Sequence, residues 1–378
     1  MCAEVDVVVV GAGIAGLAHA LAAHRLGRSV LVLERSPRSV GASVRNFGMI
    51  WPIGQPDGPM RNTALRSRQI WIDVARSAGF WLSECGSMHL AHHDDEMAVL
   101  SEFVAASEDP SALRLCDPAT VREFLPWVNP QGLRGGLFSR TECAVDPRQA
   151  LERLAAWLSE RPGVEVRFAT PVRAVESARV LLADGTACRA THVFVCTGED
   201  HRLLFPEVFH AQPVRLCKLQ MMRTLPQPGT GRLGLHAAGG STLRHYPAFA
   251  NCPSLPAVRE RFRRERPEFD RRGIHVMASQ NHLGEVVIGD SHEYGDVFDP
   301  DSREDTDAMI LEYLAGMLTL PDPRPAARWH GVYLKHTLGE PALTAVPQPG
   351  VHVFNALGGN GMTLGFALAE QHVRQALG

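Results

Sequence analysis

Hydrophobic and polar positions in the first 34 residues predict two strands with a helix between them. The run 5-VDVVVV-10 holds five valines in six residues, which is typical of a strand buried in a parallel sheet. Apolar residues then recur at helical spacing in 17-LAHALAAHRL-26, and Gly27 suits the end of that helix. A second apolar run, 29-SVLVL-33, leads directly into Glu34. This order predicts a β-α-β unit at the start of the chain.

A further helix and a group of strands are predicted in the next part of the chain. The segment 144-AVDPRQALERLAAWLSERPG-163 begins with Asp146 as an N-cap, followed by a proline at the first helical position. Residues 164–176 and 179–198 alternate as a β-meander, with Asp184-Gly185 as a tight hairpin turn.

Further along the chain the pattern changes to short strands separated by loops rich in proline and glycine. Residues 214–224, 275–280 and 285–291 read as strands of a mostly antiparallel sheet. Alternation in the first of them places Lys218 and Gln220 on one face. We therefore expect an α/β region combined with an α+β region.

The bulk composition excludes several classes of function. A chain of 378 residues, with 45% hydrophobic and 21% charged residues, is an ordinary globular protein large enough for two domains. The net charge of -3 gives no reason to expect nucleic acid as a partner. Acids interrupt the basic run 259-RERFRRERPEFDRR-272, which we interpret as a solvated helix and turn. With no signal peptide and no segment long enough to span a membrane, a cytoplasmic protein is expected.

No metal site is predicted from the sequence. The eight cysteines are scattered and form no C-x-x-C pair. His89, His92 and His93 lack a partnered carboxylate at a metal-binding spacing, so surface or core positions are the simpler interpretation.

Three glycines between the first strand and the first helix carry the clearest chemistry. Gly11, Gly13 and Gly16 stand in the G-x-G-x-x-G spacing that makes a tight turn, admits a pyrophosphate and allows close helix–strand packing. The helix N-terminus supplies N–H donors for phosphates, and Glu34 is placed to accept hydrogen bonds from the adenosine ribose. Glu34 would repel the 2′-phosphate of NADP but does not distinguish NAD from FAD. The sequence therefore predicts a dinucleotide site.

The following loop favours FAD. Residues 36–56 form a long polar loop after the second strand. In a simple NAD-binding fold the chain would enter a helix soon after this strand. Ser43, Asn46 and Gly48 fit the pattern S-x-x-N-x-G, and here the chain resembles the D-amino-acid oxidase superfamily of FAD enzymes, in particular the bacterial D-amino-acid dehydrogenases.

The resemblance continues to the C-terminal part of the chain. Val172 matches a residue whose backbone faces the adenine, and Gly198 a second close approach of backbone to FAD. The turn 358-GGNGMT-363 resembles the turn whose N–H groups and following helix dipole face the flavin and stabilise negative charge on its reduced form. Some relatives attach FAD through a cysteine near the C-terminus. Because the last cysteine here is Cys252, we expect non-covalent FAD.

The resemblance implies an α/β FAD-binding domain of Rossmann type, interleaved with an α+β substrate domain on a mostly antiparallel sheet. Residues 1–80, 145–212 and 323–378 are expected in the FAD domain, and residues 81–144 and 213–322 in the substrate domain. The positions implied to bind FAD are Gly11, Gly13, Ile14, Ala15, Gly16, Glu34, Arg35, Ala42, Ser43, Asn46, Gly48, Val172, Thr197, Gly198, Gly359, Asn360, Gly361, Met362 and Thr363.

Members of this superfamily oxidise a C–H bond next to an amine. The resemblance implies that hydride passes to flavin N5, and that the imine hydrolyses to an aldehyde plus ammonia or amine. The reduced flavin then passes its electrons to oxygen or to another acceptor. The cofactor supplies the difficult step while the protein positions the substrate.

The segment 328-RWHGVYLKHT-337 departs from the family. Relatives that oxidise amino acids carry W-x-G-L-R-P here, and the arginine holds the substrate carboxylate. Tyr333 stands at the arginine position, and a phenol does not replace a guanidinium fork. Lys335, His336 and Arg45 are the nearby candidates for positive charge. The full set of expected substrate residues is Arg45, Asn46, Lys218, Gln220, Tyr246, Tyr333, Lys335 and His336.

A phosphonate suits several point donors better than one planar fork. The blocks 45-RNFGMIWPIGQP-56, 244-RHYPAF-249 and 329-WHGVYLKHT-337 resemble a clade of these flavoproteins associated with aminophosphonate breakdown. The substrate predicted from this resemblance is 2-aminoethylphosphonate or its N-methyl or 1-hydroxy derivative.

Three alternatives remain open from the sequence. The first is an oxidase or dehydrogenase for glycine, sarcosine or a D-amino acid. The second is a flavin monooxygenase, because Gly289-Asp290 resembles a pair that such enzymes place near the flavin ribose. The third is a non-catalytic FAD-dependent sensor or assembly protein.

Overall fold

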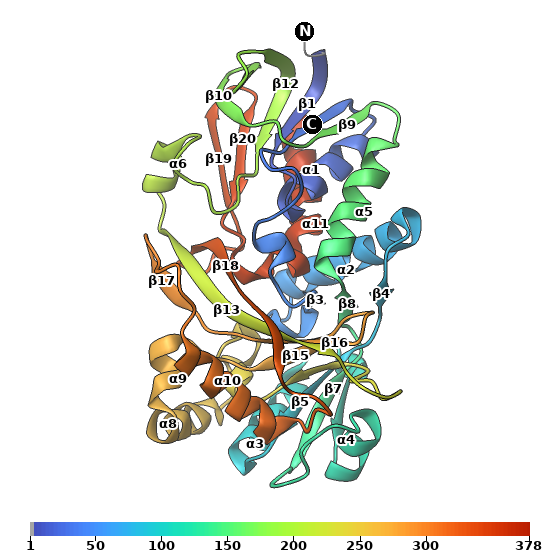
Figure 1. Ribbon diagram of the computed structural model, residues 1–378, viewed down its shortest axis with the longest axis vertical. Coiled ribbons are helices and arrows are strands. Elements are labelled where there is room, and N and C mark those ends of the chain that lie inside the picture. The colour runs from blue at the N-terminus through green and yellow to red at the C-terminus, as the bar shows by residue number, and fades with distance from the viewer. Residues whose placement is uncertain (1–3) are drawn as a thin grey trace.

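A computed structural model describes residues 4–378, which form two regions stacked along the long axis of the molecule (Figure 1). One region is built on an eight-stranded sheet and the other on a nine-stranded sheet. The first carries helices packed on a largely parallel sheet, and the second is mostly antiparallel. The predicted fold class, a Rossmann-type α/β region with an α+β region, is therefore confirmed.

The first sheet has the order β10-β11-β12-β1-β2-β9, with β20 paired to β12 and β19 paired to β20. Its strands are β1 (Glu4–Val10), β2 (Val30–Leu33), β9 (Val164–Arg167), β10 (Val172–Glu176), β11 (Arg179–Leu182), β12 (Ala187–Val195), β19 (Leu343–Gln348) and β20 (Val351–Asn355). β1 is parallel to both β12 and β2. Protein covers both faces of the second half of β1, which explains why residues 7–10 are four consecutive buried valines.

The predicted β-meander at residues 164–198 is only partly right. β9 runs parallel to β2 at the far edge of the sheet, with Val164 opposite Val30. Only β10, β11 and β12 form a meander, and its hairpin turn is at Asp184-Gly185 as predicted. The chain turns between β9 and β10 at Ala169, whose φ is +51°, and Pro171 follows without an N–H for a strand ladder.

Four helices pack around the first sheet: α1 (Ile14–Arg25), α2 (Pro59–Ala78), α5 (Pro147–Ser159) and α11 (Gly361–Leu377). The Asp146 carboxylate accepts a hydrogen bond from the Arg148 N–H at 3.1 Å, so the predicted N-cap of α5 is confirmed. Leu151, Leu154 and Leu158 on this helix are fully buried.

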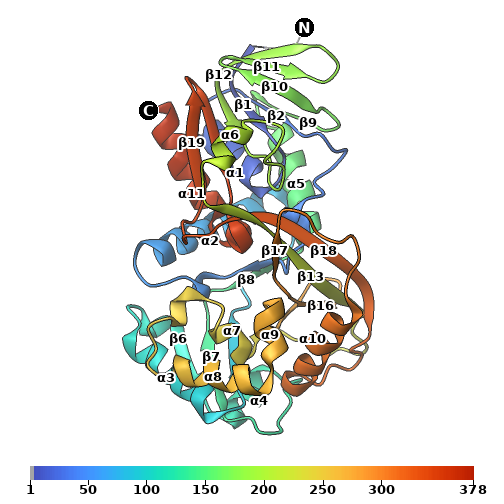
Figure 2. The same ribbon diagram turned by 90° about the vertical axis from the view of Figure 1, so that its left-hand side faces the viewer.

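The second sheet has the order β17-β13-β16-β15-β14-β5-β7-β6, with β18 paired to β13. Its strands are β5 (Ser87–Ala91), β6 (Leu113–Cys116), β7 (Gly135–Ser139), β13 (Val214–Pro226), β14 (His236–Ala238), β15 (Met277–Gln280), β16 (Glu285–Gly289), β17 (Glu293–Gly295) and β18 (Pro325–His336). β13 and β18 are antiparallel from Val214 opposite His336 to Thr224 opposite Pro325. Figure 2 shows this long pair spanning both regions. The domain boundaries drawn from the sequence stay a prediction. β18 was expected in the FAD domain, but its pairing with β13 makes it part of the second sheet.

Smaller elements complete the two regions. A three-stranded sheet of β3 (Met49–Ile50), β4 (Leu82–Ser83) and β8 (Cys143–Val145) lies between them. The remaining helices are α3 (Asp94–Ala106), α4 (Pro118–Phe124), α6 (Pro206–His210), α7 (Gly240–Leu243), α8 (Leu255–Glu265), α9 (Pro267–Arg272) and α10 (Glu304–Met317). Short 3-10 turns lie at Ala42–Val44, Pro52–Gly54, Pro110–Ala112, Pro247–Phe249 and Gly358–Asn360.

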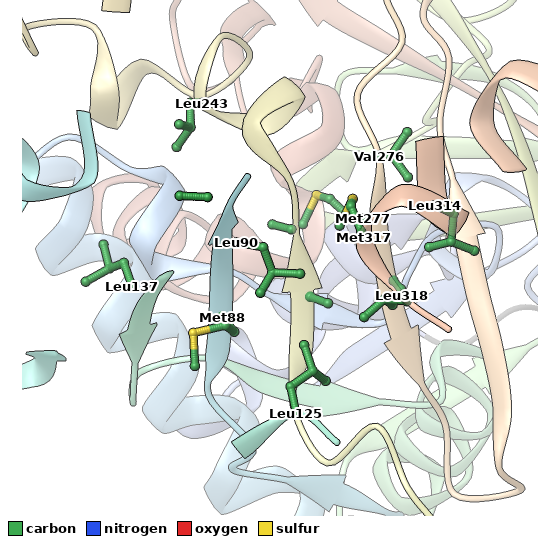
Figure 3. Packing of buried hydrophobic residues seen from close by; sticks show 14 of the residues in the cluster. Met88, Leu90, Leu125, Leu137, Leu243, Val276, Met277, Leu314, Met317 and Leu318 are labelled. Carbon is green, nitrogen blue, oxygen red and sulfur yellow. The ribbon is translucent and has the colours of Figure 1, made fainter. Parts of the chain in front are cut away.

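The core of the second region joins segments that are distant in the sequence (Figure 3). Met88 and Leu90 of β5 belong to the same buried cluster as Met277 of β15 and Leu314 of α10. This packing fixes the position of the second sheet and of the loops that leave it.

The basic run at residues 259–272 is not fully solvated, so that interpretation is wrong in part, most clearly at Arg261. Arg261 on α8 is largely buried and pairs with Asp95 at 2.8 Å and Glu96 at 2.6 Å. Tertiary packing against α3 turns this arginine inward, whereas Arg263 and Arg264 stay exposed. In residues 4–378, no helix combines the length and apolar character needed to cross a membrane.

Candidate active site

A cavity of about 650 Å³ lies between the two regions and is lined by both of them. One end is formed by the turn after β1, the end of β2 and the loop at residues 39–47. The other end is formed by β18, by the loop of residues 245–247, and by three residues near β15 and β16. The glycine-rich turn before α11 lies along the same cavity. We call these the nucleotide end and the substrate end.

The glycines at the nucleotide end have the predicted geometry. Gly11 has φ +104°, and a Cβ there would overlap the carbonyl oxygen of Cys196. A Cβ on Gly16 would overlap the Gly11 carbonyl oxygen and press on Val9, so the helix packs closely on the strand. Gly11 and Gly13 line the cavity, whereas Gly16 lies behind it. Only glycine fits the backbone at positions 11 and 16.

Backbone N–H groups fix the carboxylate of Glu34. Its two oxygens accept hydrogen bonds from the Ala12 and Ser36 N–H groups, each at 2.9 Å. The side chain lies at the end of β2 and lines the cavity, as expected for a ribose acceptor. Arg35 also lines the cavity, but its guanidinium pairs with Asp200 at 2.6 Å and is more than half exposed.

The S-x-x-N-x-G motif shapes its own loop. Asn46 donates to the Ala42 and Ser43 carbonyls at 3.0 Å and accepts from the Gly48 N–H at 2.8 Å. Gly48 has φ +71°, and a Cβ there would overlap the Val145 carbonyl oxygen. Ser43 Oγ accepts a hydrogen bond from the first N–H of α1, at Ile14. Asn46 therefore acts on loop shape, because both of its polar groups already have partners.

The glycine-rich turn before α11 lies directly against β18. A Cβ on Gly359 would lie 3.4 Å from the Tyr333 hydroxyl, and a Cβ on Gly358 would lie 3.3 Å from Lys335 Cγ. Gln55 holds Asn360 by a hydrogen bond of 3.1 Å. The N-terminus of α11 thus points its N–H groups and partial positive charge at the cavity.

Residues of this turn differ in what their side chains do. Gly359, Asn360, Gly361 and Met362 line the cavity. The Thr363 hydroxyl instead accepts a hydrogen bond from the Trp51 N–H at 3.0 Å in the buried interior, away from the cavity lining.

Three residues of β18 reach the substrate end. Tyr333 is almost fully buried, and burial together with nearby Cys217 and Asp290 raises its pKa well above the ordinary value. Lys335 Nζ donates to the Tyr294 hydroxyl at 3.3 Å. His336 Nδ1 accepts from the Leu338 N–H at 3.3 Å. All three β18 residues line the cavity.

Two further predicted residues lie at the substrate end. Arg45 lines the cavity and donates from Nη1 to the His330 carbonyl at 3.2 Å. Tyr246 also lines it, and its hydroxyl lies 3.6 Å from Met277 Sδ.

Lys218 and Gln220 do not line the cavity. Lys218 Nζ donates to the carbonyls of Asp299 and Asp301 at 2.6 and 2.9 Å. Gln220 Nε2 donates to the Arg303 carbonyl at 2.6 Å. Leu219 between them faces the cavity, so strand alternation directs both polar neighbours to the opposite face. The sequence predicted that they share a face but not which face the cavity would meet.

The remaining positions predicted to bind FAD also divide into those that line the cavity and those that do not. Ile14, Ala15, Ala42, Val172, Thr197 and Gly198 line the cavity, and Gly48 and Gly16 do not. Thr197 Oγ1 donates to the Asp200 carbonyl at 2.5 Å, so this hydroxyl already has a partner within the protein. Gly198, whose φ is +65°, is then the position where the backbone itself borders the cavity.

The sequence missed three histidines at the substrate end, His245, His275 and His292, and their grouping with Asp290. His275 and Asp290 face each other through two backbone hydrogen bonds, of 2.9 and 3.2 Å. The Asp290 carboxylate lies 3.0 Å from His275 Nε2, at the substrate end of the cavity and not at the nucleotide end. No local spacing connects these residues, since three separate segments of the chain bring them together.

Comparison with known proteins agrees with this arrangement. The family described as "DAO: FAD dependent oxidoreductase" matches residues 6–374. The chain is 28% identical over 203 residues to the tRNA 5-methylaminomethyl-2-thiouridine biosynthesis bifunctional protein MnmC of Chromohalobacter salexigens, covering 51% of this chain and 28% of that protein. It is 23% identical over 215 residues to a D-amino acid dehydrogenase of Helicobacter pylori, covering 43% of this chain and 51% of that protein. The chain thus matches about half or less of the length of these relatives.

A solved structure extends the likeness to the whole fold. The crystal structure of glycine oxidase from Geobacillus kaustophilus superposes with a TM-score of 0.77 at 18% identity, covering 99% of this chain and 94% of that one. At this identity the likeness establishes the fold.

Proposed function

The chain belongs to the DAO family of FAD-dependent oxidoreductases, and within that family we propose that it oxidises a small anionic amine. The observation that carries the proposal is Lys335, an ammonium on the cavity wall beside the glycine-rich turn. Within residues 4–378 its ammonium forms no ion pair with a carboxylate, and its one side-chain hydrogen bond is to the neutral Tyr294 hydroxyl. A cation without a counter-ion on the wall of a cavity favours an anionic ligand.

FAD fits the cavity lining. Gly11 and Gly13 leave the backbone open at the start of α1, Glu34 presents a fixed carboxylate for a ribose, and the N-terminus of α11 faces the cavity. Bound FAD would supply the two-electron acceptor for a hydride from the carbon next to the amine. The FAD contacts proposed for this chain are the cavity-lining members of the predicted set, with Gly16, Gly48 and Thr363 supporting them from behind. We propose that the cofactor is held without a covalent bond.

The second feature that supports an anionic amine is the absent guanidinium. Tyr333 occupies the position where amino-acid oxidising relatives carry an arginine, and its hydroxyl lies beside the glycine-rich turn. Burial keeps Tyr333 neutral at physiological pH because its pKa is raised. Tyr333 is thus a hydrogen-bond donor without charge, and Lys335 supplies the charge as a point donor.

These donors fit a tetrahedral anion better than a planar carboxylate. A phosphonate presents three oxygens in different directions, so separate donors on β18 and in the loop at Arg45 satisfy it better than a single fork does. We therefore propose 2-aminoethylphosphonate, or its N-methyl or 1-hydroxy derivative, as the substrate. The products are the corresponding aldehyde and ammonia or an amine.

An anaerobic titration tests this proposal. Holoenzyme is mixed without oxygen with 2-aminoethylphosphonate, its N-methyl and 1-hydroxy derivatives, glycine, sarcosine and D-alanine, and the visible flavin absorbance is followed. Loss of absorbance with the phosphonates alone supports the proposal. Reduction by glycine, sarcosine or D-alanine but by no phosphonate would overturn the substrate assignment, and reduction by none of the amines would overturn amine oxidation.

Two additional measurements complete the test. Admission of oxygen, with detection of peroxide, distinguishes an oxidase from a dehydrogenase that needs another acceptor. Acid precipitation separates bound from attached flavin, and yellow colour remaining in the pellet would contradict non-covalent FAD.

A further inference from the structure

Three histidines converge at the substrate end of the cavity, outside the nucleotide site. His245 follows α7, His275 precedes β15 and His292 follows β16, so three segments of the second region each supply one ring. One ring nitrogen from each lies within 4.8 Å of those from the other two. The centroids of the His245 and His275 rings are 3.8 Å apart, and those of His245 and His292 are 4.7 Å apart. Within residues 4–378 this is the one group with the geometry to hold a metal ion.

A second, independent observation points to a ligand at this place. His275 is more than nine-tenths buried, yet its Nδ1 has no hydrogen-bond partner among the described residues. A buried polar atom without a partner costs about 1–3 kcal/mol, so such atoms in a native site ordinarily meet a bound group.

The surroundings of the rings prepare their nitrogens for coordination. His292 Nδ1 donates to the Gly273 carbonyl at 2.9 Å, which leaves its Nε2 with a free lone pair. His275 Nε2 lies 3.0 Å from Asp290 Oδ1, so an N–H on that nitrogen faces the carboxylate and Nδ1 is the free one. Metal-binding histidines in proteins are oriented by carbonyls and carboxylates in this way.

All three histidines line the cavity. His275 and His292 are buried in the second region, whereas His245 is the exposed member of the group. An ion bound by the three rings would therefore be reached from the cavity.

We propose that His245, His275 and His292 bind one divalent transition-metal ion, with zinc as the expected occupant, and leave an open coordination position facing the cavity. Three imidazoles suit Zn²⁺ and its neighbours among the transition metals, whereas Mg²⁺ and Ca²⁺ prefer oxygen ligands. Three nitrogens on one tetrahedral ion, each about 2.0–2.1 Å from it, lie about 3.4 Å apart. The three nitrogens lie within 4.8 Å of one another, so binding requires them to approach by up to about 1.4 Å. Among residues 4–378, no side-chain hydrogen bond holds the His245 ring against such a movement.

The open position has a defined use, which rests on the function proposed above. A metal at the cavity wall binds an oxygen of the substrate anion, and Lys335 binds another. Lys335 lines the same cavity as the three histidines, so the ammonium and the ion face one anion site. The metal thereby provides the positive charge that relatives supply with an arginine.

Metal binding to the holoenzyme tests the site directly, without any amine. FAD-loaded protein is treated with a chelator, exchanged into metal-free buffer and titrated with Zn²⁺ by calorimetry, and the bound metal is counted by mass spectrometry. The expected result is one Zn²⁺ per chain. Replacing Zn²⁺ with Co²⁺ should give the visible absorption bands of a four-coordinate nitrogen site.

Variants separate this site from adventitious surface binding. His245→Ala, His275→Ala and His292→Ala should each weaken Zn²⁺ binding about 100-fold or more, and Asp290→Asn should weaken it about 10- to 100-fold. His210→Ala removes an exposed histidine of α6 and should bind like the wild type. FAD content and circular dichroism confirm folding, and His245→Ala is the safest variant because its ring is not packed in the core.

The outcomes are distinct. If the wild type takes up no Zn²⁺, or if the three histidine variants bind it as the wild type does, the site is refuted. Methylphosphonate, followed through its effect on the flavin spectrum, should bind at least about 10-fold more tightly with Zn²⁺ present. Equal affinity with and without Zn²⁺ would refute the anion-binding role. Because the Zn²⁺ titration contains no amine, its result tests the metal site independently of the proposed amine oxidation.

Discussion

The two ends of the cavity are built on different principles. At the nucleotide end, glycines and backbone groups from short contiguous motifs make the surface, and polar atoms such as those of Glu34 and Asn46 already have partners. At the substrate end, side chains from distant segments converge. Among residues 4–378, His275 Nδ1 has no hydrogen-bond partner and the Lys335 ammonium has no carboxylate partner. The cofactor site is therefore defined mainly by the shape of the backbone. The choice of substrate depends on side chains whose polar groups are still free to bind a ligand.

The largest expected effect comes from the backbone of the nucleotide end. Gly16→Val would drive a side chain into the Gly11 carbonyl, which cannot move without displacing the first turn. We expect loss of FAD and destabilisation of about 3 kcal/mol or more, measured by flavin content and urea unfolding. Gly316→Ala is the control, because Gly316 lies in α10 with nothing within 4 Å of the added carbon. A Gly16→Val protein that keeps FAD would show that close packing there is dispensable.

Acid should destabilise both regions through buried histidines. Burial lowers the pKa of His19 and of His89 to about 3, and that of His236 to about 4. The unfolded chain binds these protons below about pH 6.5 and the folded chain does not, so stability is lost as pH falls from about 6.5 towards 4. Each such histidine should cost about 2 kcal/mol at about pH 5.

Urea unfolding at about pH 7.5 and about pH 5 measures this loss. His89→Gln should reduce the difference between the two pH values by about 2 kcal/mol, whereas His210→Gln, at an exposed position, should leave it unchanged. An unchanged pH dependence in His89→Gln would mean that His89 is protonated in the folded protein.

Removal of the Lys335 charge should affect the substrate end alone. Lys335→Gln is expected to lower kcat/KM for an anionic amine about 10- to 100-fold, because a hydrogen bond to a charged group is worth about 1.5–3 kcal/mol. FAD content should not change. Lys335→Arg should recover part of the loss, and equal kinetics in Lys335→Gln and wild type would exclude a role in anion binding.

A smaller effect is expected at Lys218, on the face of β13 opposite Leu219. Lys218→Met removes hydrogen bonds to the Asp299 and Asp301 carbonyls and should lower the free energy of unfolding by about 1–2 kcal/mol, with kcat/KM unchanged. Urea unfolding and steady-state kinetics on the same preparation check both statements. A kinetic defect without loss of stability would place Lys218 at the substrate after all.

Sequence patterns were reliable where one short segment contains the whole feature. The strand at Val5–Val10, the glycine turn, the Asp146 cap and the hairpin at Asp184-Gly185 are all set by neighbouring residues. Sequence patterns failed where the interacting partner is far away along the chain. The strand at residues 164–167 was assigned to the meander because its pairing with β2, across more than a hundred residues, leaves no local signal. Arg261 was interpreted as solvated because Asp95 and Glu96 lie in another helix.

By itself the sequence determined the first β-α-β unit, the helix after Asp146, the dinucleotide turn and the absence of an arginine at Tyr333. These follow from spacing within a few residues, which backbone geometry translates directly into local structure. Only the tertiary structure decided that Leu219, and neither Lys218 nor Gln220, faces the cavity, because alternation fixes which residues share a face but not what covers it. It also brought His245, His275 and His292 together from three segments, since the distance between side chains that are remote in sequence is set by how the second sheet packs.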